Sequence, residues 1–358
     1  MISVLKNWFH RYFSNEEAVV LFVVLVGSFA IILTTGGILG PVFVSVVLAF
    51  LMQGLVTVLT TRGVPHMLSV SLVVTIFMSF LFALIFLLLP LVWGQVISLF
   101  GELPRMLEKG RALLGALPEQ YPELVNEVQI QSWMGMAGKE LGSLGQWALS
   151  NSMSTITNIV SLLIYLILVP ILVFFFLKDK DVITSWFSSM LPRQRGLMSK
   201  VWWEMDAQIA NYIRGKAIEI LVVGSASYAV FAFMGLNYAI LLGILVGLSV
   251  IIPYVGAAVV TVPVAMIGAS QWGWTSDFFY LMIAYGIIQA LDGNVLVPFL
   301  FSEVVNLHPV AIIVAVLFFG SIWGLWGVFF AIPLATLIQA VLNAWPSGNP
   351  AINPPIEK

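Results

Sequence analysis

Residues 238–270 read YAILLGILVGLSVIIPYVGAAVVTVPVAMIGAS, an apolar run of 33 residues without a charged side chain. As one α-helix the run would be about 50 Å long, whereas the hydrocarbon core of a bilayer is about 30 Å thick. Pro253 lacks a backbone donor, and Gly247 and Gly256 loosen the helix around it. The run therefore predicts a membrane helix that breaks between 247 and 263, either as a re-entrant hairpin or as one span kinked at Pro253.

The chain as a whole is too apolar for a water-soluble fold. Of its 358 residues, 60% are hydrophobic and 9% are charged, and the mean hydropathy is +1.04, whereas soluble domains carry roughly 25% charged residues. Lipid must therefore be the solvent for much of the surface. The net charge of −2 gives no footprint for nucleic acid, and the absence of cysteine excludes disulfides, thiolate metal sites and cysteine nucleophiles.

Apolar runs long enough to cross a bilayer recur along the chain. A crossing helix needs about 20 apolar residues. We count eight spans, at about 18–34, 41–59, 67–93, 152–177, 217–235, 238–270, 278–301 and 309–342. The prediction is an all-α polytopic integral membrane protein.

The spans divide the chain into five predicted regions. They are N-terminal spans at 1–93, an amphipathic extracytoplasmic region at 94–151, a span with a cytoplasmic segment at 152–216, a transmembrane core at 217–345 and a disordered tail at 346–358. Charges alternate with apolar side chains in 94–151, which predicts short amphipathic helices at the outer surface. A solvated loop is the alternative for that region.

Positive charge is concentrated in one connecting segment, which predicts the orientation. Seven basic residues separate the fourth and fifth spans: Lys178, Lys180, Arg193, Arg195, Lys200, Arg214 and Lys216. Loops that stay in the cytoplasm carry such an excess. This segment and the N-terminus are therefore predicted to be cytoplasmic, and an even number of spans places the C-terminus on the same side.

A carboxylate lies inside another apolar run, in the segment QALDGNVLVP at 289–298. Asp292 follows Asp277 by 15 residues, about 22 Å along a helix. If Asp277 marks the membrane surface, Asp292 lies deep in the hydrocarbon region, where an ionisable group costs several kcal/mol unless it is paired or hydrated. Gly293 and Asn294 predict a local unwinding of the helix beside it.

Two interpretations of Asp292 remain open. It binds a proton, a cation or a substrate hydroxyl, or it forms a structural ion pair with Arg214 or Lys216 or caps a broken helix. In the functional interpretation the two broken segments together form a substrate- or ion-binding site. Its predicted residues are Pro253, Tyr254, Gly256, Asp292, Gly293, Asn294 and Pro298.

A third segment, GSIWGLWGVFFAIP at 320–333, predicts a further break near 320–335. Its glycines allow close helix approach, and Pro333 interrupts an overlong run. Gly327 and Pro333 echo Gly256 and Pro263, which would fit a repeated hairpin, although packing glycines explain the pattern as well. The remaining polar residues considered are expected at the membrane surface: Glu219 at the start of a span, Glu303 and His308.

The motifs of ATP-driven pumps and of intramembrane hydrolases do not occur in the sequence. There is no phosphate-binding Walker lysine, no His-Glu-x-x-His and no Gly-x-Ser-x-Gly. We expect neither an enzyme nor a bound cofactor or metal.

Several segments resemble one known family. They are LILVPILVFFFLKDK at 166–180, LPRQRGL at 191–197, QIANYIRGK at 208–216, SVIIPYVG at 249–256, IQALDGN at 288–294 and NLHP at 306–309. Together they are similar to the autoinducer-2 exporter family. The resemblance implies a bacterial inner-membrane protein of about eight spans that forms a homo-oligomer, with five subunits expected. It also implies export of a small furanone-type signal or sodium (lithium)/proton antiport, and it supplies no catalytic residues.

Two classes of function follow from these observations. The first is a secondary transporter that moves a small polar solute or ion by alternating access, with a monovalent cation/proton antiporter as a variant. The second is a membrane scaffold that transports nothing and uses 94–151 and 178–216 as partner surfaces.

Overall fold

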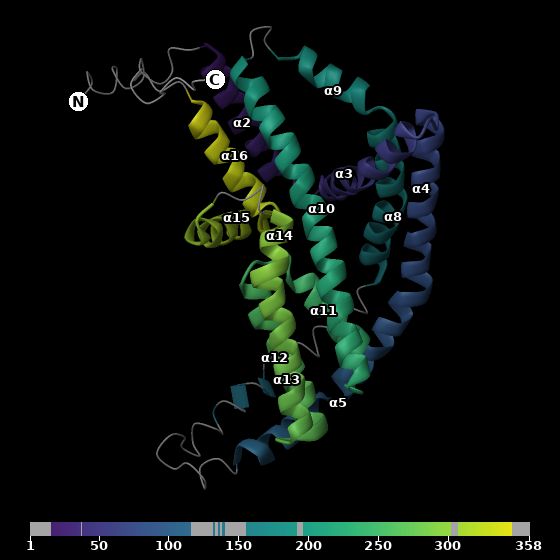
Figure 1. The fold of residues 1–358 in the computed structure, drawn as a ribbon, viewed down its shortest axis with the longest axis vertical. Helices are drawn as coiled ribbons and strands as arrows, with labels where there is room; N and C mark the ends of the chain where they lie inside the picture. The colour runs from purple at the N-terminus through teal and green to yellow at the C-terminus, as the bar shows by residue number, and fades with distance from the viewer. Residues whose placement is uncertain are drawn as a thin grey trace, which may run out of the picture. The chain divides into compact units, whose positions relative to one another are not determined.

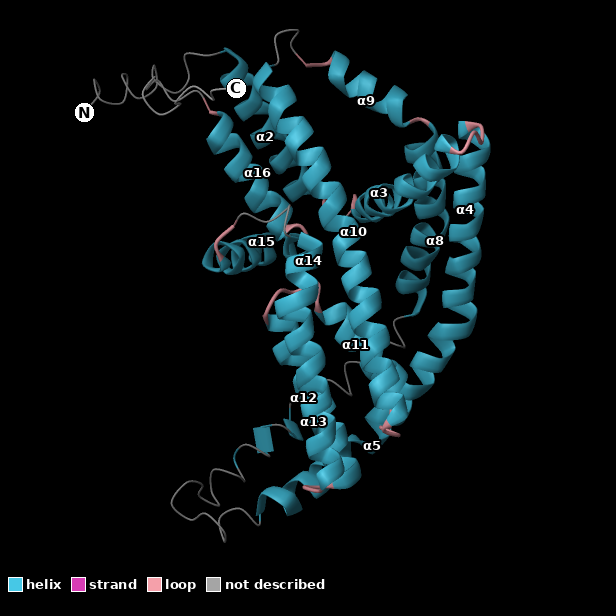
Figure 2. Cartoon of the chain, in the orientation of Figure 1, coloured by secondary structure: helices cyan, strands magenta, loops and turns pink. Residues whose placement is uncertain are grey.

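The computed structural model describes residues 16–36, 38–115, 132, 135–136, 138–139, 155–191, 196–301 and 307–345. All regular structure in these ranges is helical, as Figure 2 shows, so the predicted all-α class is confirmed. Most of the predicted outer region, the predicted tail from 346 and Glu303 lie outside the described residues.

Six helical stretches among the described residues are long and apolar enough to cross a membrane. They are Gly40–Thr61, His66–Gly110, Gly196–Phe233, Val255–Trp272, Ser276–Phe301 and Pro309–Phe329. Four shorter apolar helices accompany them, at Val19–Thr35, Leu163–Lys178, Ala239–Ser249 and Ala331–Ala344. Large apolar side chains remain exposed on them, including Phe299 at 80% and Leu87 at 68%. Such a surface needs lipid around it.

The chain forms two compact units, each made of segments distant in sequence. Unit 1 comprises Met1–Val73, Val169–Arg214 and Phe301–Lys358, and unit 2 comprises Val74–Leu168 and Gly215–Leu300. The boundaries fall within helices, so one helix can contribute to both units (Figure 1). The five regions predicted along the sequence are a different kind of division and remain a prediction.

Unit 1 holds the helices of both chain ends. Its elements are α2 (Glu16–Thr35), α3 (Gly40–Thr61), the start of α4 (His66–Ala83), the end of α8 (Thr155–Lys178), α9 (Lys180–Ser189), the first half of α10 (Gly196–Phe233), α15 (Pro309–Phe329) and α16 (Ala331–Ala344). Tyr212 is 1% exposed, packs against Phe301 and Phe329, and donates a hydrogen bond to the Phe329 carbonyl at 2.9 Å.

The predicted break near 320–335 is confirmed in unit 1. α15 kinks at Gly324, which has φ 60, and the chain turns back into α16. Gly327 lies so close to the Phe319 carbonyl that a Cβ would not fit. Glycine is therefore required at the closed end of the α15–α16 hairpin.

Unit 2 contains the candidate site. Its elements are the end of α4, η1 (Leu84–Leu88), α5 (Leu89–Gly115), the start of α8, the second half of α10, α11 (Ala239–Ser249), α12 (Val255–Trp272), α13 (Ser276–Leu291), η2 (Asp292–Leu296) and most of α14 (Val297–Phe301). Phe231, Leu242, Val264 and Leu281 form the centre of its core, each 0% exposed. α12 and α13 run side by side (Figure 1), with Gly268 against Leu281.

The run at 238–270 folds as a hairpin whose base and tip are both held by close contacts. At the base, the side-chain amide of Gln271 accepts a hydrogen bond from the backbone N–H of Asn237 at 2.8 Å. It also donates a hydrogen bond to the Gly235 carbonyl at 2.8 Å. At the tip, Gly256 presses on the Ser249 carbonyl with no room for a Cβ. α11 has 11 residues, about 16 Å, too short to cross a 30 Å core. Of the two alternatives for this run, the hairpin is correct and the single kinked span is wrong.

Candidate ion- and substrate-binding site

A buried ion pair lies on α10 beside the hairpin tip. Lys216 and Glu219 are one turn apart, with Lys216 Nζ 2.8 Å from Glu219 Oε2, and their side chains are 6% and 2% exposed. Lys216 Nζ also donates to the Val250 carbonyl at 2.8 Å. The lysine therefore links α10 to the turn between α11 and α12.

The hairpin tip offers this carbonyl because the helix is interrupted there. The last four carbonyls of a helix have no partner within the helix, and α11 ends at Ser249. Pro253 has no donor to continue the ladder, and Tyr254 adopts φ 62 before α12 begins. The lysine replaces the backbone donor that a continuous helix would have supplied.

Glu219 was expected at the membrane surface, and this expectation is wrong. It assumed a span beginning near 217, whereas α10 begins at Gly196 and has 38 residues. Glu219 therefore precedes the helix end at Phe233 by 14 residues, about 21 Å. The carboxylate is enclosed by protein instead of facing water.

Asp292 faces the same charges from another helix. It begins η2, and it lies within electrostatic reach of Lys216 and Glu219. Its Oδ1 is buried and has no hydrogen-bond partner among the described residues, and the same holds for Nε2 of Gln289, one turn earlier. An unused acceptor and an unused donor thus lie on one side of the helix.

A hydroxyl pair extends this polar line. Tyr285, one turn before Gln289, is 2% exposed. The Tyr285 hydroxyl lies 3.3 Å from Thr261 Oγ1 and 3.4 Å from the Ala257 carbonyl on α12. Polar groups therefore follow α13 and η2 from Tyr285 to Asp292.

The neighbours of Asp292 differ from the prediction. The expected unwinding at Gly293 and Asn294 is a π-turn, in which the helix widens without breaking. Asn294 is exposed and donates to the Ala290 carbonyl at 2.8 Å. Gly293 and Pro298 are exposed as well. These three predicted site residues shape the helix but do not face the buried charges.

The predicted hairpin residues have two different positions. Pro253 and Gly256 build the tip that Lys216 contacts, whereas the Tyr254 side chain is 61% exposed. The alternative of an ion pair between Asp292 and Lys216 is replaced by an arrangement in which Lys216 bonds Glu219 and Asp292 lies nearby.

Sequence reasoning missed Lys216, Glu219, Gln289 and Tyr285 as members of one cluster. A signal was present, since Lys216 and Glu219 are the last charges before an uncharged run that extends to Ser276. No group of three or more metal-ligating side chains occurs in the part of the chain that the structure describes. The groups available to a ligand are the carboxylates of Glu219 and Asp292, the ammonium of Lys216 and the amide of Gln289.

Comparisons with known proteins agree with these features. The family model for AI-2E family transporters matches residues 19–347. The chain is 44% identical over 348 residues to "Putative permease PerM" of Escherichia coli (strain K12), covering 97% of this chain and 99% of the relative. It is 28% identical over 308 residues to "Putative transport protein YueF" of Bacillus subtilis (strain 168), covering 84% and 82%.

A more distant relative has a more specific name. "AI-2 transport protein TqsA" of Escherichia coli (strain K12) is 22% identical over 331 residues, covering 91% of this chain and 92% of the relative. These matches extend over nearly all the described helices, the broken hairpins included. The chain is therefore a membrane transporter that belongs to the AI-2E family.

Proposed function

We propose that this protein is a secondary transporter that couples the movement of a small polar solute or ion to the charge state of the cluster of Lys216, Glu219 and Asp292. The observation that carries the proposal is the charge count of that cluster. With all three groups ionised, it has one negative charge in excess. A buried site of this kind is costly unless it is neutral, so one proton or one monovalent cation completes it.

The same cluster supplies a route from charge to conformation. Lys216 forms an ion pair with Glu219 and donates a hydrogen bond to the Val250 carbonyl at the hairpin tip. A cation bound at Glu219 and Asp292 competes with the ammonium for the carboxylates. In the proposed mechanism this competition changes how firmly the tip is held, and the tip moves between two positions as occupancy changes.

A monovalent cation/proton antiporter is the second candidate, and the same charge deficit favours it. A proton and a sodium or lithium ion neutralise the cluster equally well by charge, so the two can exchange at one site. Solute transport and antiport differ in what crosses the membrane with the coupling ion, and a flux measurement distinguishes them.

The test is transport by the purified full-length protein in proteoliposomes. An internal pH dye reports proton movement after imposed sodium, lithium or potassium gradients, and radiolabelled small polar solutes, with the signal molecule AI-2 among them, report solute flux. We expect ion-driven flux in the native protein and none in Asp292→Asn. A folded native protein that moves nothing would instead support the scaffold function.

We also propose the setting in which the transporter works. The relatives named above are bacterial, and with the excess of basic residues at 178–216 they support the inner membrane with both termini in the cytoplasm. The family resemblance supports a homo-oligomer of five subunits. Mass photometry of the protein in nanodiscs measures the subunit number directly, and a monomer would contradict this part of the proposal.

A further inference from the structure

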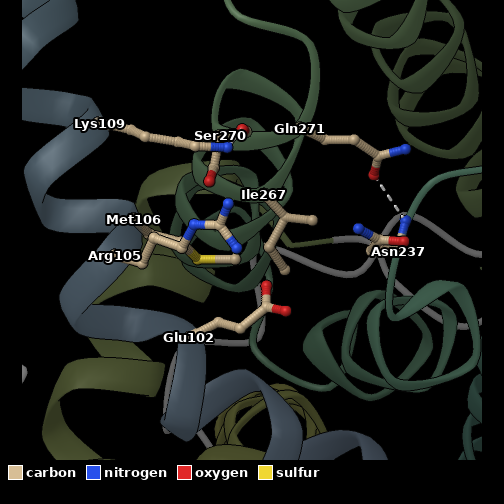
Figure 3. Close-up of a pocket in the computed structure, with 8 residues that line it drawn as sticks. All are labelled: Glu102, Arg105, Met106, Lys109, Asn237, Ile267, Ser270 and Gln271. Carbon is tan, nitrogen blue, oxygen red and sulfur yellow. Dashed lines mark hydrogen bonds between the residues drawn. The ribbon is translucent and has the colours of Figure 1, made fainter.

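A second polar site lies at the base of the hairpin. A cavity of about 190 Å³ is lined by α5, by the turn before α11 and by the last turns of α12 (Figure 3). A cavity of this volume holds several water molecules or a small solute. From Val255 at the tip to Ser270 at the cavity is 15 residues of α12, about 22 Å. The cavity is therefore distinct from the cluster at the tip.

Most polar groups around the cavity already have partners. Lys109 Nζ donates to the Ser270 carbonyl at 3.0 Å, and the Glu102 carboxylate lies within electrostatic reach of the Tyr238 hydroxyl. Gln271 uses both ends of its amide on the turn before α11, as the dashed line to Asn237 in Figure 3 shows for one of them. These contacts fix α5 to the base of the hairpin.

Arg105 is the exception. Its guanidinium lines the cavity (Figure 3), and within the described part of the chain no hydrogen bond or ion pair holds it. Two basic groups and one acidic group give the cavity a net positive charge. Lys109 has a structural role, because it binds a carbonyl in the last turn of α12. Arg105 has no such role among the described contacts.

We propose that this cavity binds a small anion through a carboxylate or phosphate group, with Arg105 as its bidentate partner. A guanidinium presents parallel N–H donors that match the oxygens of either group. Lys109 keeps N–H donors that its bond to Ser270 does not use. The bound anion joins α5 to the base of the hairpin, and binding does not require that the tip cluster couple transport.

The anion has two possible sources, a free solute and the phosphate of a lipid headgroup. The test uses the full-length protein in phosphatidylcholine nanodiscs and follows thermal unfolding by tryptophan fluorescence. Potassium phosphate and potassium succinate are titrated against potassium chloride at matched ionic strength. Arg105→Gln is the test variant, and Arg62→Gln, at an exposed arginine that ends α3, is the matched control.

We expect phosphate or succinate to raise the melting temperature of the native protein beyond the chloride effect. The half-saturating concentration should be at least tenfold higher in Arg105→Gln and unchanged in Arg62→Gln. Equal titrations of Arg105→Gln and the native protein would overturn the proposal. So would the absence of any anion-specific shift, unless lipid already fills the site.

A lipid arm resolves that case. The titration is repeated in nanodiscs containing phosphatidylglycerol, and retained lipid is measured by native mass spectrometry. A lipid-headgroup source predicts phosphatidylglycerol retained by the native protein and lost in Arg105→Gln, with a weakened response to added phosphate. A free-solute source predicts the same anion response in both lipids. No anion-specific shift together with no Arg105-dependent retention would refute the anion site.

Discussion

Replacement of Lys216 by methionine tests whether the buried cluster is organised as described. The substitution keeps an unbranched side chain but removes the ammonium that holds Glu219 and the Val250 carbonyl, each at 2.8 Å. Leaving a buried charge without its partner costs about 3–5 kcal/mol, and leaving a buried carbonyl unpaired costs about 1–3 kcal/mol. We therefore expect Lys216→Met to lower the free energy of unfolding by about 4–8 kcal/mol, the sum of the two contributions.

The double variant Lys216→Met/Glu219→Leu separates the two contributions. It removes both charges of the pair, so the Val250 carbonyl loses its lysine donor without an unpaired Glu219 beside it, and the loss should fall to about 1–3 kcal/mol. Glu219→Leu alone should cost less than Lys216→Met, because Asp292 remains within electrostatic reach of the lysine. Lys216→Met is therefore expected to be the least stable of the three variants.

The assay is unfolding by sodium dodecyl sulfate in mixed micelles, analysed as a double-mutant cycle. Lys180→Met, at an exposed lysine that begins α9, is the matched control and should change stability by less than about 0.5 kcal/mol. A loss below about 1 kcal/mol in Lys216→Met would refute the buried pair. A double variant no more stable than Lys216→Met would refute the coupling between Lys216 and Glu219.

Three further predictions follow from other features. Asp292→Asn removes the excess negative charge and leaves the Lys216–Glu219 pair intact, so thermal stability should be equal or higher while ion-driven flux is lost; a clear loss of stability would contradict this. Gly256→Ala forces a Cβ into the Ser249 carbonyl and should cost at least about 2 kcal/mol in the same micelle titration, whereas Gly293→Ala, which meets nothing within 4 Å, should be tolerated. A reporter fused after Trp345 should read out in the cytoplasm, and a signal from the outer face would refute the predicted orientation.

The fold was predictable where single residues impose a local rule. Pro253 has no backbone N–H to continue an α-helix, and Gly256 allows the close backbone contact that a turn requires. The break in 238–270 could therefore be inferred from the length of the run and these two residues. For the second hairpin the break was predicted from Pro333, whereas the helix kinks at Gly324, one of the glycines interpreted as packing residues. A helix break depends on the proline and glycine residues near it, so its approximate position can be predicted from the sequence.

The site was predictable only in part, because its partners come from different helices. The depth of Asp292 follows from counting residues along one helix, but its proximity to Lys216 and Glu219 depends on how α10 packs in unit 2. The polar first half of α10 was interpreted as a surface segment, which placed Glu219 at the membrane boundary. Asn294 remains a predicted site residue, but its amide donates to a carbonyl of its own helix, a choice that composition does not reveal.

The wide turn at Asp292–Leu296 means that the position of the carboxylate depends on residue number as well as residue type. A π-turn accommodates one residue more than the α-helix on either side of it would need. Deletion of Gly293 would restore regular α-geometry and shorten the helix by only about 1.5 Å. Because the wide turn takes up the extra residue, the later residues would keep nearly the same face relative to Tyr285 and Gln289. A variant that keeps each polar side chain but has one residue fewer would thus leave Val297–Phe301 on nearly the same face and change the turn that holds the Asp292 carboxylate.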